Sequence, residues 1–549
     1  MRPYYSAPVT EETIAEPAVP AGAGGDPPRR RLGVNTAIFA IATGVSRVAG
    51  LAREIVAAGY FGQTPPASAF TIASQIPNLM SNLFAQAALS AAFVPVFTDL
   101  LQQGRKREAF RLASTLFWII LIGLGAITAL GILLAGVIMP LFTGTQLTGA
   151  DTALAAGLAQ VLFPVVLLLG LTGMLVGILQ SYDEFTIPAL APAVWNIVIL
   201  AGLIGLRSSF HAPIYAYAVA WLAATAVQML LVASALRRID FRLTLQIDWR
   251  DPRIRQVFVL MLPVTIGLGI VNLDQLLNAT FGGLVSSSAP RAIDQAFRIY
   301  MLPQGVFSVA VATVLFPTLS RQAARKAPGE MRRAIGNGMR QINLLLIPSA
   351  ALMIVLATPI ARLVFQHGHQ TPADTHRTSV ALFWFAFSLP FGGLNLLLTR
   401  TFFALQRPWI PTRYAAMNMV VDVIVSVALY GPFGIAGLVI GTAVANAVMV
   451  GLQYRRLAIG FNRRLEGPQT LMITARILVA SALMAVVGWL VWSVLDSLLG
   501  HSTIAQIISV GLAVAAGGAL YARAVLVMRV PEARQIEALV LSRLGRQIP

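Results

Sequence analysis

The sequence contains no cysteine, which excludes disulfides, thiolate nucleophiles and cysteine-ligated metals. Charged residues are also scarce, at 11% of the chain, whereas soluble domains carry about 25%. Lysine is nearly missing, because it is found only at Lys106 and Lys326. The net charge of +18 therefore comes almost wholly from arginines, which gather in short loops between apolar stretches. Because this distribution indicates no basic face on a soluble domain, we expect no nucleic-acid partner.

The sequence also lacks the signatures of catalysis. It has no glycine-rich loop of Walker spacing, and no nucleophile–base pair is evident in it. We therefore expect neither an enzyme nor a protein with a bound cofactor.

Hydrophobic residues, by contrast, make up 57% of the chain, and the mean hydropathy is +0.75. The apolar stretches are continuous over about 20 residues or more, which predicts helices rather than the alternating strands of a membrane barrel. We predict an all-α polytopic membrane protein with about fourteen transmembrane helices. The predicted spans are residues 34–61, 68–97, 110–140, 152–180, 187–206, 213–236, 256–284, 293–318, 336–362, 377–403, 412–430, 434–455, 471–497 and 502–528.

A weak internal repeat indicates two halves. Residues 60–62 recur as residues 280–282, and residues 76–79 resemble residues 302–305. Transporters built from repeats place their substrate site between the halves, near the middle of the membrane. We therefore predict two six-helix lobes around a central cavity, followed by two further helices. The predicted parts are a disordered cytoplasmic tail (1–31), an N-lobe (32–236), an inter-lobe loop (237–255), a C-lobe (256–465), two C-terminal helices (466–530) and a cytoplasmic tail (531–549).

The charges of the loops predict the orientation in the membrane. Basic residues fill alternate loops, such as residues 105–107 and 321–333, while loops such as residues 62–67 carry no charge. By the positive-inside rule, this alternation predicts an even number of spans with both termini in the cytoplasm.

Three of the arginines within the predicted spans are candidates for a substrate site. Arg47 and Arg53 belong to the first span, and Arg298 belongs to the eighth. A guanidinium near the membrane centre stays charged at a cost of at least about 2.5–3.5 kcal/mol, so it usually faces a wet cavity or an anion. Three converging guanidinium groups would suit a pyrophosphate, because each can bind phosphate oxygens in bidentate fashion. Two plainer interpretations stay open: Arg47 pairs with Glu54, and Arg298 extends to the outer surface.

A second polar group lies in the predicted C-lobe. Asp274 and Asp422 are acids at membrane depth, Asn418 lies four residues before Asp422, and Thr442 adds a hydroxyl oxygen. Such oxygens predict a cation site for Na⁺, or a proton relay, that would serve a coupling ion. The alternative is that these acids pair with arginines such as Arg413.

The most specific motifs lie in the first, second and eighth predicted spans. They are Ser46–Glu54, Phe61–Gly62, Ile76–Leu79, Ala92–Pro95, Ala296–Arg298, Pro303–Val306 and Phe316–Leu319. Together these segments resemble the MurJ (MviN) family of lipid II flippases, which belongs to the MOP exporter superfamily. The resemblance extends over about residues 32 to 530.

The resemblance implies a flippase in the bacterial plasma membrane. Its substrate would be lipid II, an undecaprenyl-pyrophosphate-linked muropeptide, moved from the inner to the outer leaflet by alternating access for peptidoglycan synthesis. The implied partners are lipid II and membrane lipids. The resemblance implies substrate-binding roles for Arg47, Arg53 and Arg298, and it places Asn82 where the family has a further arginine.

The chain departs from the family pattern at three positions. Asn82 replaces an arginine, while Ser68 and Gln86 replace acids, so fewer charges are expected in the cavity. Other functions therefore stay open. One is a flippase of the same superfamily for another polyprenyl-linked glycan, and another is a non-transporting scaffold for cell-wall enzymes. A cation-coupled drug antiporter fits less well, because its cavity should be acidic.

Overall fold

The structure is a computed structural model that describes residues 28–537, apart from residues 85, 183, 185, 240, 242, 245–247, 463–464 and 536. Within these residues every regular element is a helix, which confirms the predicted all-α class. Eleven helical segments among them are long and apolar enough to cross a membrane. The predicted spans 34–61, 68–97 and 256–284 are not among these eleven, so the number fourteen stays a prediction.

The helices follow the predicted spans, several of which are divided into shorter helices. In chain order they are α1 (Pro28–Phe61), α2 (Pro65–Phe84), α3 (Gln86–Gln102), α4 (Lys106–Phe142), α5 (Gly149–Leu162), α6 (Pro164–Ser181), α7 (Thr186–Leu206), η1 (Arg207–Ser209), α8 (Ile214–Ala235), η2 (Leu236–Arg238), α9 (Pro252–Val285), α10 (Ala289–Pro303), η3 (Gln304–Ser308), α11 (Val309–Ala324), α12 (Pro328–Val355), α13 (Ala357–Phe365), α14 (Pro372–Ala404), α15 (Trp409–Phe433), α16 (Ile435–Gly460), α17 (Gly467–Leu499) and α18 (Thr503–Val527). Two divisions fall beside a proline, because Pro164 begins α6 and Pro303 ends α10. Proline favours the first turn of a helix and interrupts its interior.

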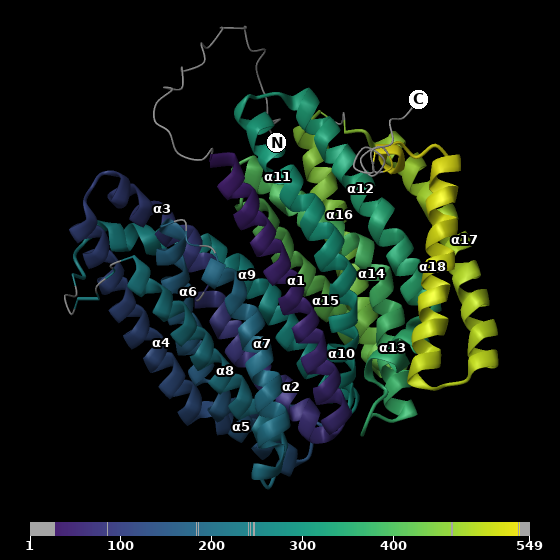
Figure 1. The fold of residues 1–549 in the computed structure, drawn as a ribbon, viewed down its shortest axis with the longest axis horizontal. Coiled ribbons are helices and arrows are strands. Elements are labelled where there is room, and N and C mark those ends of the chain that lie inside the picture. Colours follow the sequence, from purple (N-terminus) through teal and green to yellow (C-terminus); the bar gives the residue numbers. More distant parts are fainter. Residues whose placement is uncertain are drawn as a thin grey trace.

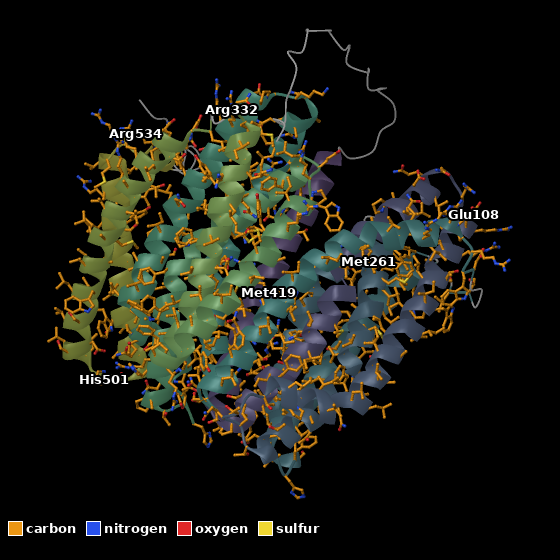
Figure 2. The ribbon with its side chains drawn as sticks, turned by 180° about the vertical axis from the view of Figure 1, so that it is seen from behind. Glu108, Met261, Arg332, Met419, His501 and Arg534 are labelled. Atoms are coloured by element: carbon orange, nitrogen blue, oxygen red, sulfur yellow. The ribbon has the colours of Figure 1, made fainter. Side chains whose placement is uncertain are left out.

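Two groups of helices diverge at one end of the molecule and meet at the other (Figure 1). The first group contains α1 to α8 and the second contains α10 to α16. Helix α9 packs against α2 and α3 in the first group and against α15 in the second. Figure 2 places Glu108 and Arg332 at the tips of the diverging arms, and His501 at the opposite end, which we name the joined end. The residue limits that we predicted for the lobes stay predictions.

Each group has its own apolar core. Leu158 and Tyr217 belong to a core of the first group, and Leu346 and Leu389 belong to the core of the second. Outside the cores, α4, α17 and α18 expose large apolar side chains such as Leu133, as expected of surfaces that face lipid. Because the cores are largely separate, the two groups can change their angle without unpacking either one.

Glycines allow the two groups to approach closely at the joined end. Gly62 has a φ of +58°, and a Cβ added there would lie 2.9 Å from the backbone oxygen of His369. The backbone N–H of His369 donates a hydrogen bond of 2.8 Å to the oxygen of Gly59. The end of α1 therefore meets the loop before α14 backbone to backbone, which a larger side chain would prevent.

Most of the two predicted tails lies outside the described residues. Residues 28–31, which we predicted to be disordered, form the first turn of α1, where Pro28 suits a helix start. Residues 531–535, at the start of the predicted C-terminal tail, are helical. There Glu532 is buried and pairs with Arg340 of α12, which fixes this segment to the second group.

Candidate functional site

A buried glutamate lies where the two groups of helices meet. Glu54 is on α1, next to Arg53, whose Nη2 is 2.7 Å from Glu54 Oε1. The hydroxyl of Tyr217, from α8, donates a hydrogen bond of 3.1 Å to the same oxygen. The first group therefore engages one carboxylate oxygen of Glu54, and the other is available to the second group.

The second group contributes two arginines from α10. Arg291 Nη2 and Arg298 Nε each lie 3.3 Å from Glu54 Oε2. Asp294 accepts a hydrogen bond of 3.1 Å from Arg291 Nη1 and one of 3.0 Å from Arg298 Nε. Spacings of three and four residues place these three side chains on one face of α10. We name Arg53, Glu54, Arg291, Asp294 and Arg298 the arginine cluster.

Most of the arginine cluster is enclosed. Arg53, Glu54 and Arg291 are buried, whereas the Arg298 side chain is 32% exposed. Removing an ion from water costs several kcal/mol unless other charges compensate for it. Three guanidinium groups face only two carboxylates, so the ionised cluster has one positive charge in excess. Arg298 is therefore the member that an incoming anion reaches first.

The cluster also contains polar atoms that are not satisfied. Arg53 Nη1 and Arg291 Nε are buried and have no hydrogen-bond acceptor among the described residues. Glu54 Oε2 is likewise buried and makes ion pairs without a well-directed hydrogen bond. Leaving a buried donor unpaired costs about 1–3 kcal/mol. An anionic ligand would accept hydrogen bonds from these unused donors and would balance the excess positive charge.

Aromatic side chains hold Arg53 from the side of the first group. Its guanidinium carbon lies 5.0 Å from the centre of the Trp195 ring and 5.2 Å from that of Trp221. Tyr217 stacks on Phe70 with 4.3 Å between ring centres. Cation–π contacts of this kind contribute about 0.5–2 kcal/mol each. They restrict the guanidinium to one position and so organise the site before a ligand binds.

Arg47 contacts the second group at a different place. A Cβ added to Gly305, in η3, would lie 1.9 Å from Arg47 Nη1, so the guanidinium packs against bare backbone. The interpretation in which Arg47 pairs with Glu54 is wrong, because Arg53 takes that position. Arg47 and Glu54 are seven residues apart, or about 10 Å along the helix axis, whereas Arg53 is adjacent.

We predicted that the arginines within the spans converge. Arg53 and Arg298 do so, because both pair with Glu54. Arg298 does not simply extend to the surface, because its Nε also pairs with Asp294. Arg291 and Asp294 are not among the site residues predicted from the sequence. Their spacing relative to Arg298 was a usable signal, but Arg291 precedes the predicted start of the span at residue 293. Arg291 therefore adds a positive charge to the site, although the departures from the family pattern predict fewer charges there.

The three positions that depart from the family pattern are only partly described. Asn82 lies on α2, but its side chain is outside the part of the chain whose side chains the structure describes, as is that of Gln86. Ser68, near the start of α2, is fully buried, and its hydroxyl makes no hydrogen bond to the described residues. Substrate binding by Asn82 stays a prediction.

The residues predicted to bind a cation gather around Asp422 of α15. Asn278 of α9 donates a hydrogen bond of 2.8 Å to Asp422 Oδ2, and Ser426 donates one of 3.2 Å to Oδ1. Thr442 of α16 lies 3.4 Å from Oδ2. Asn278 and Ser426 were not predicted, although each is four residues from a predicted acid and therefore on the same helix face.

Asp274 and Asn418 lie less tightly in this site. The Asp274 carboxyl is within hydrogen-bonding range of Asp422, while its Oδ1 is buried without a partner among the described residues. The Nδ2 of Asn418 is also buried and unpaired within the described part of the chain. Two carboxyls with neutral oxygens nearby suit a small hard cation or a shared proton. No group of three histidine, aspartate or glutamate residues that could hold a metal occurs in the described part of the chain.

Comparison with known proteins identifies relatives along most of the chain. A family model described as "Lipid II flippase MurJ" matches residues 57–530. A protein named lipid II flippase MurJ from Burkholderia cenocepacia is 27% identical over 426 residues, which cover 76% of this chain and 82% of that protein. A protein named probable lipid II flippase MurJ from Rhizobium tropici is 30% identical over 433 residues, covering 75% and 79% respectively.

Solved structures show the same fold. A structure titled lipid II flippase MurJ in an inward closed conformation has a TM-score of 0.73 at 22% identity, and the match covers 89% of this chain and 99% of that one. An inward-facing multidrug transporter of the MATE family and MOP superfamily has a TM-score of 0.66 at 15% identity, with 76% and 95% covered. At these identities the likeness concerns the fold alone.

Proposed function

The chain belongs to the MurJ lipid II flippase family, and from this premise we propose that it moves lipid II across the bacterial inner membrane. It is accordingly a multi-pass membrane transporter, and its helices place large apolar side chains toward the lipid. The observation that supports headgroup binding most directly is the arginine cluster. It combines three guanidinium groups, one positive charge in excess and unused donors at the junction of the two helix groups.

The pyrophosphate of lipid II would enter the arginine cluster at Arg298. Phosphate oxygens compete there with Asp294 and Glu54 for the guanidinium, whose planar fork matches a phosphate in bidentate fashion. The unpaired nitrogens of Arg53 and Arg291 are further donors for the same anion. Before substrate binds, the two carboxylates hold the arginines in place and limit their mutual repulsion.

Alternating access requires that the joined end can open, and buried amides close it. Gln63 Nε2 donates hydrogen bonds to Gln295 Oε1 at 2.8 Å, to Thr378 Oγ1 at 2.7 Å and to the Asp374 oxygen at 3.0 Å. Gln370 Nε2 donates to Gln295 Oε1 at 3.1 Å. We name Gln63, Gln295, Gln370 and Thr378 the amide lock. We propose that these bonds break when the headgroup is released at the joined end.

Replacing Gln63 by leucine is expected to favour opening of the joined end. The side chain keeps its size but loses two N–H donors, which the three acceptors share; at about 0.5–1.5 kcal/mol for each donor, this loss favours the open state by about tenfold or more. Because the chain has no native cysteine, Ala58→Cys can report on this motion. Ala58 is buried on α1 against the core of the second group.

The rate at which a maleimide labels that cysteine should rise in the Gln63→Leu variant. Gln160→Leu is the matched control, because Gln160 donates a single exposed hydrogen bond to Ile132 and lies outside the amide lock. Equal labelling rates in the parent, the Gln63→Leu variant and the control would show that the amide lock does not hold this end closed.

We further propose that Asp274 and Asp422 take the coupling ion, either Na⁺ or a proton. Helix α9 carries Asp274 and Asn278 and also packs against α2 and α3, so binding at this site can alter the angle between the two groups. In this proposal both termini are cytoplasmic, which places the wide end of the molecule inward.

Asp422→Asn is expected to lower flipping about tenfold or more and to abolish its dependence on the driving ion. The amide keeps the size of the carboxyl but carries no charge and cannot take up a proton. Flipping of lipid II in proteoliposomes with an imposed Na⁺ or proton gradient measures this effect. Asp99→Asn, at an acid that pairs with Gln103 on an exposed surface, serves as the control. An unchanged ion dependence in Asp422→Asn would remove this site from the coupling mechanism.

Growth of bacteria depleted of their own lipid II flippase tests the proposed function itself. Expression of this chain should restore growth. Failure to do so, despite normal insertion in the membrane, would favour a flippase for another polyprenyl-linked glycan or a scaffold for cell-wall enzymes.

A further inference from the structure

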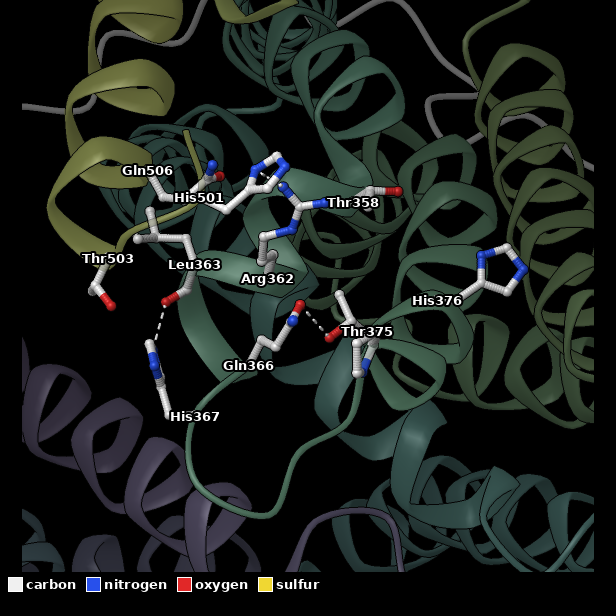
Figure 3. A pocket seen from close by; sticks show the side chains of 11 residues that line it. Thr358, Arg362, Leu363, Gln366, His367, Thr375, His376, His501, Thr503 and Gln506 are labelled. Atoms are coloured by element: carbon white, nitrogen blue, oxygen red, sulfur yellow. Dashed lines mark hydrogen bonds between the residues drawn. The ribbon is translucent and has the colours of Figure 1, made fainter. Parts of the chain in front are cut away.

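A polar cavity of about 330 Å³ lies at the joined end, between α13, the start of α14 and the turn from α17 to α18 (Figure 3). Its volume falls in the lower part of the range of about 300–1,000 Å³ typical of small-molecule sites. None of the residues that line it belongs to the arginine cluster or to the group around Asp422. The cavity is therefore a separate feature for which flipping has no evident use.

Arg362 lines the cavity with a positive charge and has N–H donors that are not used within the described part of the chain. Its Nη1 lies 3.3 Å from His501 Nδ1 and 3.6 Å from Asp496 Oδ1. Within the described part of the chain, its hydrogen bonds and ion pairs run through Nη1, which leaves Nε and Nη2 for a ligand. Asp496 is itself held by Gln506 Nε2 at 2.6 Å, so the guanidinium has a fixed anchor.

Gln506 provides an acceptor that has no partner. Its side chain is 2% exposed, it lines the cavity, and its Oε1 makes no hydrogen bond to any described residue. The bond from Nε2 to Asp496 identifies the remaining amide atom as the oxygen. The cavity thus combines guanidinium donors with a buried acceptor. A ligand that satisfies both carries an anionic oxygen and a hydroxyl group.

The position of the cavity indicates where such a ligand comes from. Helix α17 ends at Leu499 and α18 begins at Thr503, and a polar turn between two membrane helices lies in the headgroup layer. Beside it, Leu498 and Ile504 are 74% and 72% exposed, which offers an apolar surface for acyl chains. We propose that this cavity binds the hydroxylated phosphate headgroup of an anionic phospholipid, whose acyl chains lie along α17 and α18.

Native mass spectrometry of the full-length protein, with phosphatidylglycerol and phosphatidylcholine as probes, tests the proposal. We expect the protein to retain phosphatidylglycerol about tenfold more strongly than phosphatidylcholine. The Arg362→Gln variant should lose that preference. Arg377→Gln is the matched control, because Arg377 lies nearby on α14 but does not line the cavity. Equal preference in the Arg362→Gln variant and the parent would overturn the proposal.

Leu363→Trp keeps the test decisive if Arg362→Gln fails to fold. Leu363 lines the cavity, so the indole fills the space without removing a charge, and it should also abolish the preference. Retention of the preference in this variant would contradict the proposal. A further arm uses soluble glycerol phosphate. If glycerol phosphate bound as tightly as phosphatidylglycerol and depended equally on Arg362, the site would take a soluble phosphate and the assignment to a lipid would be wrong.

Discussion

Glu54→Gln is expected to abolish flipping and to lower the free energy of unfolding by about 3–5 kcal/mol. Glutamine keeps the shape of the side chain but removes the charge that Arg53, Arg291 and Arg298 share. Asp294 would then be the one carboxylate of the arginine cluster, and it contacts Arg291 and Arg298 but leaves the buried Arg53 without a carboxylate partner in the cluster. The loss should appear as a lower thermal unfolding temperature in detergent and as failure to restore growth of flippase-depleted bacteria.

Glu466→Gln is the control for this prediction. Glu466 pairs with Arg340 at 2.8 Å, but this pair lies at the wide end of the second group and belongs to no proposed substrate site. It should cost some stability and leave flipping intact. If Glu54→Gln restored growth as well as the parent does, Glu54 would not organise the substrate site.

Arg298→Ala is expected to abolish flipping with little change in stability. Arg298 is the most exposed member of the arginine cluster, although still partly buried, and without it Glu54 still has Arg53 and Arg291 as partners. A hydrogen bond to a charged group contributes about 1.5–3 kcal/mol, so the loss of the Arg298 contacts should weaken headgroup binding by about ten- to a hundredfold. Arg298→Lys keeps the charge but not the planar fork, so only partial activity is expected.

Rates of lipid II flipping in proteoliposomes measure this effect, together with unfolding temperatures to separate function from folding. Arg332→Ala serves as the control, because Arg332 lies at the tip of the second group and, among the described residues, donates only to the oxygen of Pro328. An Arg298→Ala variant that flips at the parental rate would exclude the exposed guanidinium as the entry point for the headgroup.

The membrane fold was predictable because apolar length is a local property of the sequence. A continuous apolar stretch such as residues 110–140 can satisfy its backbone in lipid only as a helix, so the predicted span and α4 coincide. Divisions within spans were less predictable, because they depend on packing as well as on proline. Pro164 marks the start of α6, but Pro390 lies inside α14 without dividing it.

The candidate site was predictable to the extent that a charge within an apolar stretch is conspicuous. Arg53 and Arg298 were found in this way, but the partner of Glu54 was not. The seven-residue spacing suggested that Glu54 pairs with Arg47, whereas the direction of the side chains places it beside Arg53. Arg291 and Asp294 were missed because they lie where α10 emerges from the apolar stretch. Their burial arises from the approach of α1 and α10, which sequence spacing does not reveal.

Binding of lipid II to the purified protein tests the central claim, that the arginine cluster holds the pyrophosphate headgroup. The dissociation constants of the parent, Arg298→Ala and Arg332→Ala should be compared in the same detergent, with inorganic pyrophosphate as a competitor. We expect Arg298→Ala to bind lipid II at least about tenfold more weakly, Arg332→Ala to bind it like the parent, and pyrophosphate to displace lipid II from the parent. Equal dissociation constants for the parent and Arg298→Ala would show that Arg298 does not hold the headgroup.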